Sequence, residues 1–233
     1  MPAPGQRARP SAIEPRLIVD EVYARLMALV MDGDVRPGDP LSIDALAREL
    51  GVSSTPLREA LARLESTGLV RRYAMKGYRV APVLTPEELA ELVDVRLALE
   101  PVAVRRAVAS PSPELQRRLR DAVARLEAAP RGDHFETFRD YLEADEAFHR
   151  EIFAHAGNRF LTRAYESLGS QVQRFRLFSG EGVTDAEPTI HEHAAILAAI
   201  EAGDEDGAVA AMVRHLEGVR SRAIVDTERQ HRD

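Results

Sequence analysis

The sequence predicts a mainly α-helical protein, in which a winged helix-turn-helix domain with a small β-wing precedes an all-helical bundle. Apolar residues recur at helical spacing over most of the 233 residues, as expected for helices that bury one face. Only residues 69–73 and 78–82 look like strands, on either side of a turn at Lys76-Gly77. The length fits two small domains, because a domain usually holds about 100–200 residues.

The domains are expected over residues 16–83 and 84–230, after a flexible tail, residues 1–15, that is rich in Pro and Arg. The formal net charge of −7 argues against nucleic acid as a partner of the chain as a whole. The charge is unevenly divided, however. Residues 1–83 hold 12 Lys/Arg against 10 Asp/Glu, a net of +2, and the remainder holds 19 against 28, a net of −9. The acidity therefore belongs to the second domain.

Composition excludes several classes of site and location. The chain has no Cys, which rules out a disulfide scaffold, a Cys-ligated zinc finger, an iron–sulfur site and thiol chemistry. No apolar run approaches the roughly 18 residues of a membrane span, and the first ten residues lack the hydrophobic segment of a secretory signal. A cytoplasmic protein with no membrane partner is expected.

The first domain contains the elements of a DNA reader in order. A helix is expected from Leu17, and Ser42 caps a short helix that stops at Gly51. Thr55 and Pro56 suit the N-cap and first position of the next helix. Two short helices followed by a two-stranded ribbon form a winged helix-turn-helix, whose second helix enters the major groove of DNA.

The start of that second helix and the tip of the wing carry the candidate DNA contacts. Arg58 lies off the apolar stripe and can bind guanine with two hydrogen bonds, while hydroxyls and the helix N-terminus suit phosphate. Gly77 lets the wing approach the DNA backbone closely. A helical hairpin with ordinary solvated Arg is the alternative. The candidate contacts are Ser53, Ser54, Thr55, Arg58, Lys76 and Gly77.

The second domain shows helical patterns only. Thr85 and Glu88 form a capping box around Pro86 at the start of the first helix. Six helices are expected, over about 86–109, 113–129, 134–155, 158–178, 188–202 and 205–228.

Four titratable residues of this domain lie on apolar helix faces. At 100° per residue, Asp145 falls in the middle of its core stripe, and His149 lies beside it one turn on. His193 and His215 lie ten residues before and 12 residues after Gly203 on consecutive helices, so they reach nearly the same height. One Asp and three imidazoles suit zinc best, and also nickel, manganese, cobalt or Fe(II). Alternatively, each His is a hydrogen-bonded core residue, with His149 paired to Asp145.

Arg96 is a further charge on an apolar face. It falls in the middle of the apolar stripe of Leu89, where it can form an internal salt bridge with Glu100, one turn along.

Residues 33–83 resemble the DNA-binding domain of the GntR family of bacterial transcription regulators. The matching motifs include Leu50-Gly51-Val52-Ser53, Thr55-Pro56-Leu57-Arg58-Glu59-Ala60-Leu61 and Gly68-Leu69-Val70, and Ser54 stands where the family often has Arg. The resemblance implies a homodimer on a short pseudo-palindrome of double-stranded DNA.

The second domain resembles the ligand-binding FCD domain of the FadR subgroup. The matching motifs are Asp145-x-x-Phe148-His149, Glu192-His193-x-x-Ile196-Leu197 and Met212-x-x-His215-Leu216. The resemblance implies that Asp145, His149, His193 and His215 hold a metal. It also implies that Arg96 binds the carboxylate of a small organic acid effector, a role that is compatible with a salt bridge in which Glu100 positions Arg96. The protein is then a transcription regulator, most often a repressor in this family, and not an enzyme.

A metal-dependent hydrolase or lyase fused to a winged helix is the alternative function, because a His/Asp metal site with an open position can activate water. No further residue of the sequence is obviously placed as a general base, and this alternative leaves the winged helix unexplained.

Overall fold

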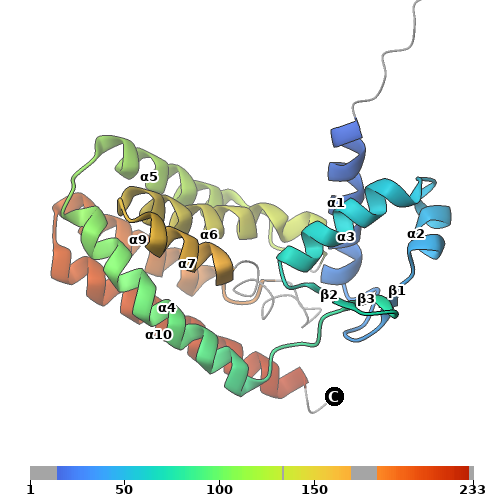
Figure 1. The fold of residues 1–233 in the computed structure, drawn as a ribbon. Coiled ribbons are helices and arrows are strands. Elements are labelled where there is room, and N and C mark those ends of the chain that lie inside the picture. The colour runs from blue at the N-terminus through green and yellow to red at the C-terminus, as the bar shows by residue number, and fades with distance from the viewer. Residues whose placement is uncertain (1–14, 133, 169–182, 231–233) are drawn as a thin grey trace, which may run out of the picture.

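The computed structural model describes residues 15–132, 134–168 and 183–230. Two lobes are visible, a smaller one that holds the sheet and a bundle of longer helices (Figure 1). The smaller lobe contains α1 (Pro15–Met31), β1 (Pro40–Leu41), α2 (Ile43–Leu50), α3 (Ser54–Ser66), β2 (Val70–Tyr73) and β3 (Gly77–Val80). The bundle contains α4 (Pro86–Val108), α5 (Pro113–Ala128), α6 (Phe135–His155), α7 (Arg159–Leu168), α9 (Ala186–Ala202) and α10 (Glu205–Gln230). The predicted mainly α-helical fold is confirmed.

The sheet of the smaller lobe has three antiparallel strands in the order β1-β3-β2. Both predicted strands are present. Strand β2 begins one residue later than expected, at Val70, and β3 begins one residue earlier, at Gly77, and ends two residues earlier, at Val80. Strand β1 was not predicted, since two residues are too short for an alternating pattern. The turn of the wing needs left-handed backbone at Met75, with φ 63°, and at Gly77, with φ 75°, and glycine adopts that conformation without strain.

The two helices of the helix-turn-helix are capped differently. The Ser42 side chain accepts a hydrogen bond from the Ala45 amide at 3.3 Å, and Gly51 ends α2 in the left-handed conformation, as predicted. The predicted N-cap Thr55 is wrong, because α3 begins at Ser54 with Ser53 as its N-cap. Pro56 is tolerated at the third helical position, since the first amides of a helix have no partner within the helix.

In the bundle, α4 packs along α10, α10 along α9, and α5 along α6. The capping box of Thr85 and Glu88 is formed as predicted. The helix predicted over 158–178 is described as α7 up to Leu168, and its remainder lies outside the described residues. So does the expected tail, except that α1 begins at Pro15.

The two lobes share buried apolar surface. One core cluster includes Leu26 and Leu61 of the smaller lobe together with Phe138 and Leu142 of α6.

No helix of the described ranges is long and apolar enough to cross a membrane.

Asp32, at the end of α1, also crosses the lobe boundary. Its carboxylate accepts a hydrogen bond from the Phe135 amide, with Oδ1 2.5 Å from the nitrogen. The N-cap of α6, His134, makes no side-chain capping bond. The first turn of α6 is therefore capped by a residue of the other lobe.

Candidate metal centre and DNA-binding surface

Three histidines from three helices meet inside the bundle. His149 of α6, His193 of α9 and His215 of α10 are each at most 1% exposed. Each offers a ring nitrogen, and these nitrogens all lie within 4.8 Å of one another. The apolar spacing of each helix turns its His toward the same interior point, so the predicted convergence of the three side chains is present.

The outer nitrogen of each ring faces an oxygen. His149 Nδ1 lies 2.7 Å from Glu100 Oε2, and His215 Nδ1 lies 2.8 Å from Glu192 Oε2. His193 Nδ1 donates to the Thr189 carbonyl oxygen at 2.7 Å. A neutral imidazole that donates through Nδ1 presents its Nε2 lone pair, so the hydrogen bonds of His193 and His215 favour the tautomer that can bind a metal, and the carboxylate beside His149 Nδ1 favours the same tautomer.

The spacing of two of the inner nitrogens matches a pair of metal ligands. His149 Nε2 and His193 Nε2 are 3.3 Å apart. Nitrogens bound to one tetrahedral zinc ion at about 2.0–2.1 Å would be separated by about 3.3 Å.

The carboxylate of Asp145 lies beside the same cluster. Asp145 lies one turn before His149 on α6 and is 7% exposed. Its Oδ1 is 3.5 Å from His193 Nε2. The structure thus brings three of the predicted ligands, His149, His193 and His215, into one cluster, and it places the carboxylate of the fourth, Asp145, beside His193. Such a donor set suits zinc and other divalent transition metals.

The electrostatics favour a neutral His215 and an ionised Glu100. Burial, followed by the neighbouring His193 and His149, holds the pKa of His215 well below its ordinary value. Burial would raise the pKa of Glu100, but Arg96 and His149 outweigh it and lower this pKa to about 2. His215 is therefore in the form that binds metals, and Glu100 stays a carboxylate.

Arg96 is buried beside the histidine cluster, at 2% exposed. Its Nε donates to Glu100 Oε1 at 2.5 Å, so the internal salt bridge considered from the sequence is present. Its Nη2 has no hydrogen-bond partner among the residues that the structure describes. An unsatisfied buried guanidinium nitrogen is costly, and an additional acceptor at this position would satisfy it.

A second layer of residues supports His215 and was missed by sequence reasoning. Arg222 donates through both terminal nitrogens to the two oxygens of Glu192, at 2.8 and 2.9 Å, and through Nε to Asp185. Glu192 was missed because it lies off the apolar face of α9. Arg222 follows His215 by seven residues, a spacing that places both on one helix face and could have indicated the pair.

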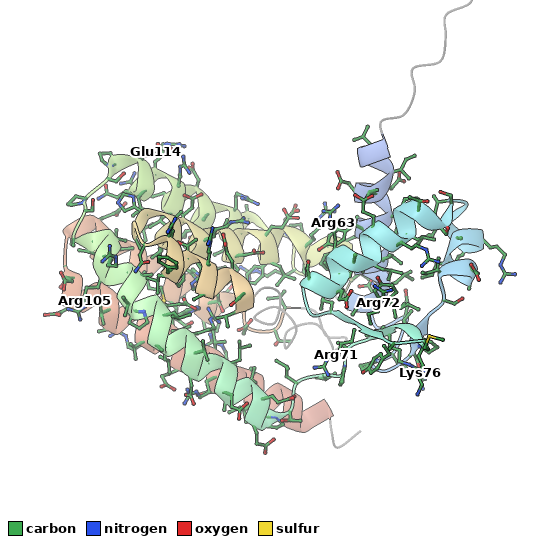
Figure 2. The ribbon with its side chains drawn as sticks, in the orientation of Figure 1. Arg63, Arg71, Arg72, Lys76, Arg105 and Glu114 are labelled. Carbon is green, nitrogen blue, oxygen red and sulfur yellow. The ribbon has the colours of Figure 1, made fainter. Side chains whose placement is uncertain are left out.

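The predicted DNA contacts are all exposed on the smaller lobe. At the start of α3, Ser53 makes no side-chain capping bond, and Arg58 is exposed next to the buried Leu57. Figure 2 places Arg71, Arg72 and Lys76 around the sheet, at the opposite end of the molecule from Arg105 and Glu114. The exposed residues are Ser53, Ser54, Thr55, Arg58, Lys76 and Gly77.

Arg71 and Arg72 of β2 are also exposed and were missed as candidate DNA contacts. The sequence feature that could have indicated them is the pair of consecutive Arg residues in the wing, four residues before Lys76. They add positive charge beside the proposed DNA-binding surface.

Comparisons with known proteins agree with both lobes. Residues 18–80 match the bacterial regulatory proteins of the gntR family, and residues 91–218 match the FCD domain. A protein of Paenarthrobacter nicotinovorans, named "Probable D-xylose utilization operon transcriptional repressor", is 29% identical over 199 residues, which are 85% of each chain.

Solved structures share the fold. A GntR-type regulator from Rhodococcus sp. RHA1 has a TM-score of 0.69 at 22% identity, over 88% of this chain and 97% of its own. The metal-free FCD domain of another regulator has a TM-score of 0.51 at 18% identity, over 61% of this chain and 96% of its own.

These relatives are transcriptional regulators and not enzymes, which overturns the alternative of a metal-dependent hydrolase or lyase. The chain is a DNA-binding transcriptional regulator that belongs to the GntR family and carries an FCD domain.

Proposed function

We propose that this regulator is a cytoplasmic, homodimeric repressor of the FadR subgroup whose FCD domain binds a divalent metal and a small carboxylate effector. The metal ligands are Asp145, His149, His193 and His215, and Arg96 binds the effector. One observation carries the proposal, namely that three buried imidazoles converge while an oxygen faces the Nδ1 of each.

Zinc is the metal that the ligand set favours, and nickel, manganese, cobalt and iron are alternatives. Glu100, Thr189 and Glu192 would hold the ligating rings in orientation, a role whose loss typically lowers metal affinity about 10–100-fold. The bound metal would supply a Lewis-acidic position to which an effector oxygen can bind.

A carboxylate is the effector group that Arg96 favours. The free Nη2 is a charged donor in the interior, and a carboxylate accepts strong, charge-assisted hydrogen bonds from a guanidinium. Through Glu100, which contacts both Arg96 and His149, this donor is linked to the metal cluster. An organic acid could then bind Arg96 with one oxygen and the metal with another. Sugar acids are one class to test, since the Paenarthrobacter relative is named for a sugar operon.

The DNA-binding half would act through α3 and the wing, with one half-site of a pseudo-palindrome bound by each protomer. An effector changes operator affinity only if it binds two conformations differently. Helix α6 is the element that connects the sites, because it carries Asp145 and His149 and is capped by Asp32, the residue that follows α1.

A second contact continues this path to α3. Helix α6 touches α1, and the charge of Glu146 on α6 adds to the raised pKa of Tyr23 on α1, which burial mainly causes and Arg63 opposes. The Arg63 guanidinium lies over the Tyr23 ring, 4.3 Å from its centre. A shift of α6 near Asp145 would therefore change the position of α3, the helix that enters the major groove, through Tyr23 and Arg63.

The test is a thermal-shift screen of sugar acids, hydroxy acids and dicarboxylates, with zinc and then with each other divalent metal. We expect metal to raise the midpoint and one acid class to raise it further, and the same acid to release an operator fragment. If no metal binds to the demetallated full chain, the proposed sensor function is wrong.

Arg58→Ala is expected to weaken specific operator binding by about 1–3 kcal/mol, the range for a bidentate base contact. A gel-shift titration at fixed salt measures the affinity, with random-sequence DNA as the competitor. Arg58→Lys is the matched variant, because it keeps the positive charge and loses the planar fork. Specific affinity that stays at the wild-type value in Arg58→Ala would remove this residue from the interface.

Asp32→Ala is expected to reduce the response of operator affinity to metal and effector while both still bind. It removes the cap of α6, a loss that costs about 0.5–2 kcal/mol of stability. Asp34→Ala is the control. Asp32 and Asp34 both line a cleft between α1, α2 and the start of α6, but Asp34 is exposed. Operator titrations with and without ligand give the coupling factor. An unchanged factor in Asp32→Ala would exclude this contact from the path.

A further inference from the structure

The outer face of α4 carries a row of apolar side chains that remain partly open to solvent. Val95 and Val102 are 43% and 46% exposed, and Leu92 and Leu99 are half-buried. In chain order, these four residues are three, four and three positions apart, a spacing that places all of them on one face of the helix. We call this row the α4 stripe. Single exposed apolar residues need no explanation, but a continuous row of four marks a surface that another molecule can cover.

Two opposite charges bound the α4 stripe. Glu91 precedes it and Arg106 follows it, and at 100° per residue both lie within about 40° of Val95 around the helix. Both side chains are exposed. Arg106 is held in place because its Nε donates to the Ala156 carbonyl oxygen at 2.7 Å, which leaves its terminal nitrogens for other acceptors. The face is therefore acidic at its N-terminal end, apolar in the middle and basic at its C-terminal end.

If two copies of α4 pack side by side in antiparallel orientation, the acidic end of each copy lies beside the basic end of the other. When two copies of α4 cross between Ala98 and Leu99, Val95 of each copy meets Val102 of the other. In the same register Glu91 of each copy meets Arg106 of the other, so two ion pairs form at once. A twofold axis requires this reciprocity, in which residue i contacts j and j contacts i.

We propose that the α4 stripe is the surface through which two copies of this chain associate, with their α4 helices antiparallel. The inference rests on the proposed homodimer and names its interface. A second copy is favoured over another partner because the antiparallel register pairs the charges of the stripe with each other and its valines with each other. The stripe lies on the bundle, away from α3 and the wing, so both DNA-binding surfaces stay free (Figure 1).

Disulfide cross-linking tests the register, since the natural chain has no Cys. In the full-length variant Val95→Cys/Val102→Cys, the two positions of one chain are about 10.5 Å apart along the helix, too far for an internal disulfide. Oxidation with diamide is expected to give covalent dimers that dithiothreitol reverses. The matched control is Arg117→Cys/Ala124→Cys, exposed positions of equal spacing on α5, and no covalent dimer is expected from it.

Charge reversal tests the ion pairs. Glu91→Arg and Arg106→Glu are each expected to raise the dimer dissociation constant at least about 10-fold, because each places like charges opposite one another twice. The double variant restores both pairs and is expected to return the constant to near the wild-type value. Analytical ultracentrifugation of the full chain measures it, and far-UV circular dichroism checks folding.

Three results would overturn the interface: a monomeric wild-type chain, a dimer that withstands both single reversals, or a double variant no tighter than the single ones. Metal content and the effector thermal shift are measured on the same samples. If these stay normal while the interface fails, the proposed sensor function stands without it. If no metal binds but the double variant restores dimer affinity, the interface is supported and the proposed sensor function is wrong.

Discussion

Replacing Arg96 with alanine is expected to lower the free energy of unfolding by about 3–5 kcal/mol, because it leaves the fully buried Glu100 carboxylate without its cation. The same variant is expected to lose the response of operator affinity to the carboxylate effector. Urea unfolding of the metal-loaded chain measures the first effect, and operator titration measures the second.

Two further variants separate stability from binding. Arg105→Ala removes an exposed ion pair with Glu205 and is expected to cost no more than about 1 kcal/mol. Arg96→Met/Glu100→Gln removes both buried charges and is expected to recover part of the lost stability without recovering the effector response. If the double variant still responds to the effector, Arg96 does not bind it. If Arg96→Ala lowers the free energy of unfolding by less than about 1 kcal/mol, Arg96 is not needed to stabilise the buried Glu100 carboxylate.

His193→Ala is expected to abolish stoichiometric metal binding and to lower the thermal midpoint on the order of 10 °C. A metal at about 1,000 times its dissociation constant stabilises the folded state by about 4 kcal/mol, and each kcal/mol moves the midpoint of a chain of this size by about 2–4 °C. Elemental analysis and a thermal scan measure the two effects.

The chain offers a matched control on the same helix. His191 lies two residues before His193 on α9 and is exposed, so His191→Ala is expected to keep both metal and midpoint. Chelation of the wild-type protein is expected to bring its midpoint down to that of His193→Ala. One metal per protomer retained in His193→Ala would remove His193 from the ligand set.

The sequence was sufficient to place the histidines because each lies on an apolar helix face whose burial is fixed by periodicity. The positions of His193 and His215 along their helix axes could also be predicted. Only Gly203 and Asp204 separate the two helices, so each distance can be counted from that turn. The position of His149 relative to them is a long-range packing result that no local pattern contains. The charge pattern of Arg96 and Glu100 indicated their salt bridge, which the structure contains, but not the unsatisfied Nη2.

Other features could not be predicted, for physical reasons. Strand β1 exists only because β3 supplies its partner, and two residues carry no pattern of their own. Glu192 and Arg222 looked like solvated surface residues, as most charges off an apolar face are. The cap of α6 by Asp32 joins residues 103 positions apart, and the local sequence before Phe135 gives no sign of it.

The Asp32 cap bears on the engineering of biosensors from this regulator. Reader and sensor modules of such proteins are naturally cut at the connecting segment near residues 81–85. A chimera made there would carry α6 without the carboxylate that caps its first turn, and would open the apolar cluster that spans both lobes. A functional graft therefore has to bring a foreign reader whose first helix ends in an acidic residue at the position of Asp32.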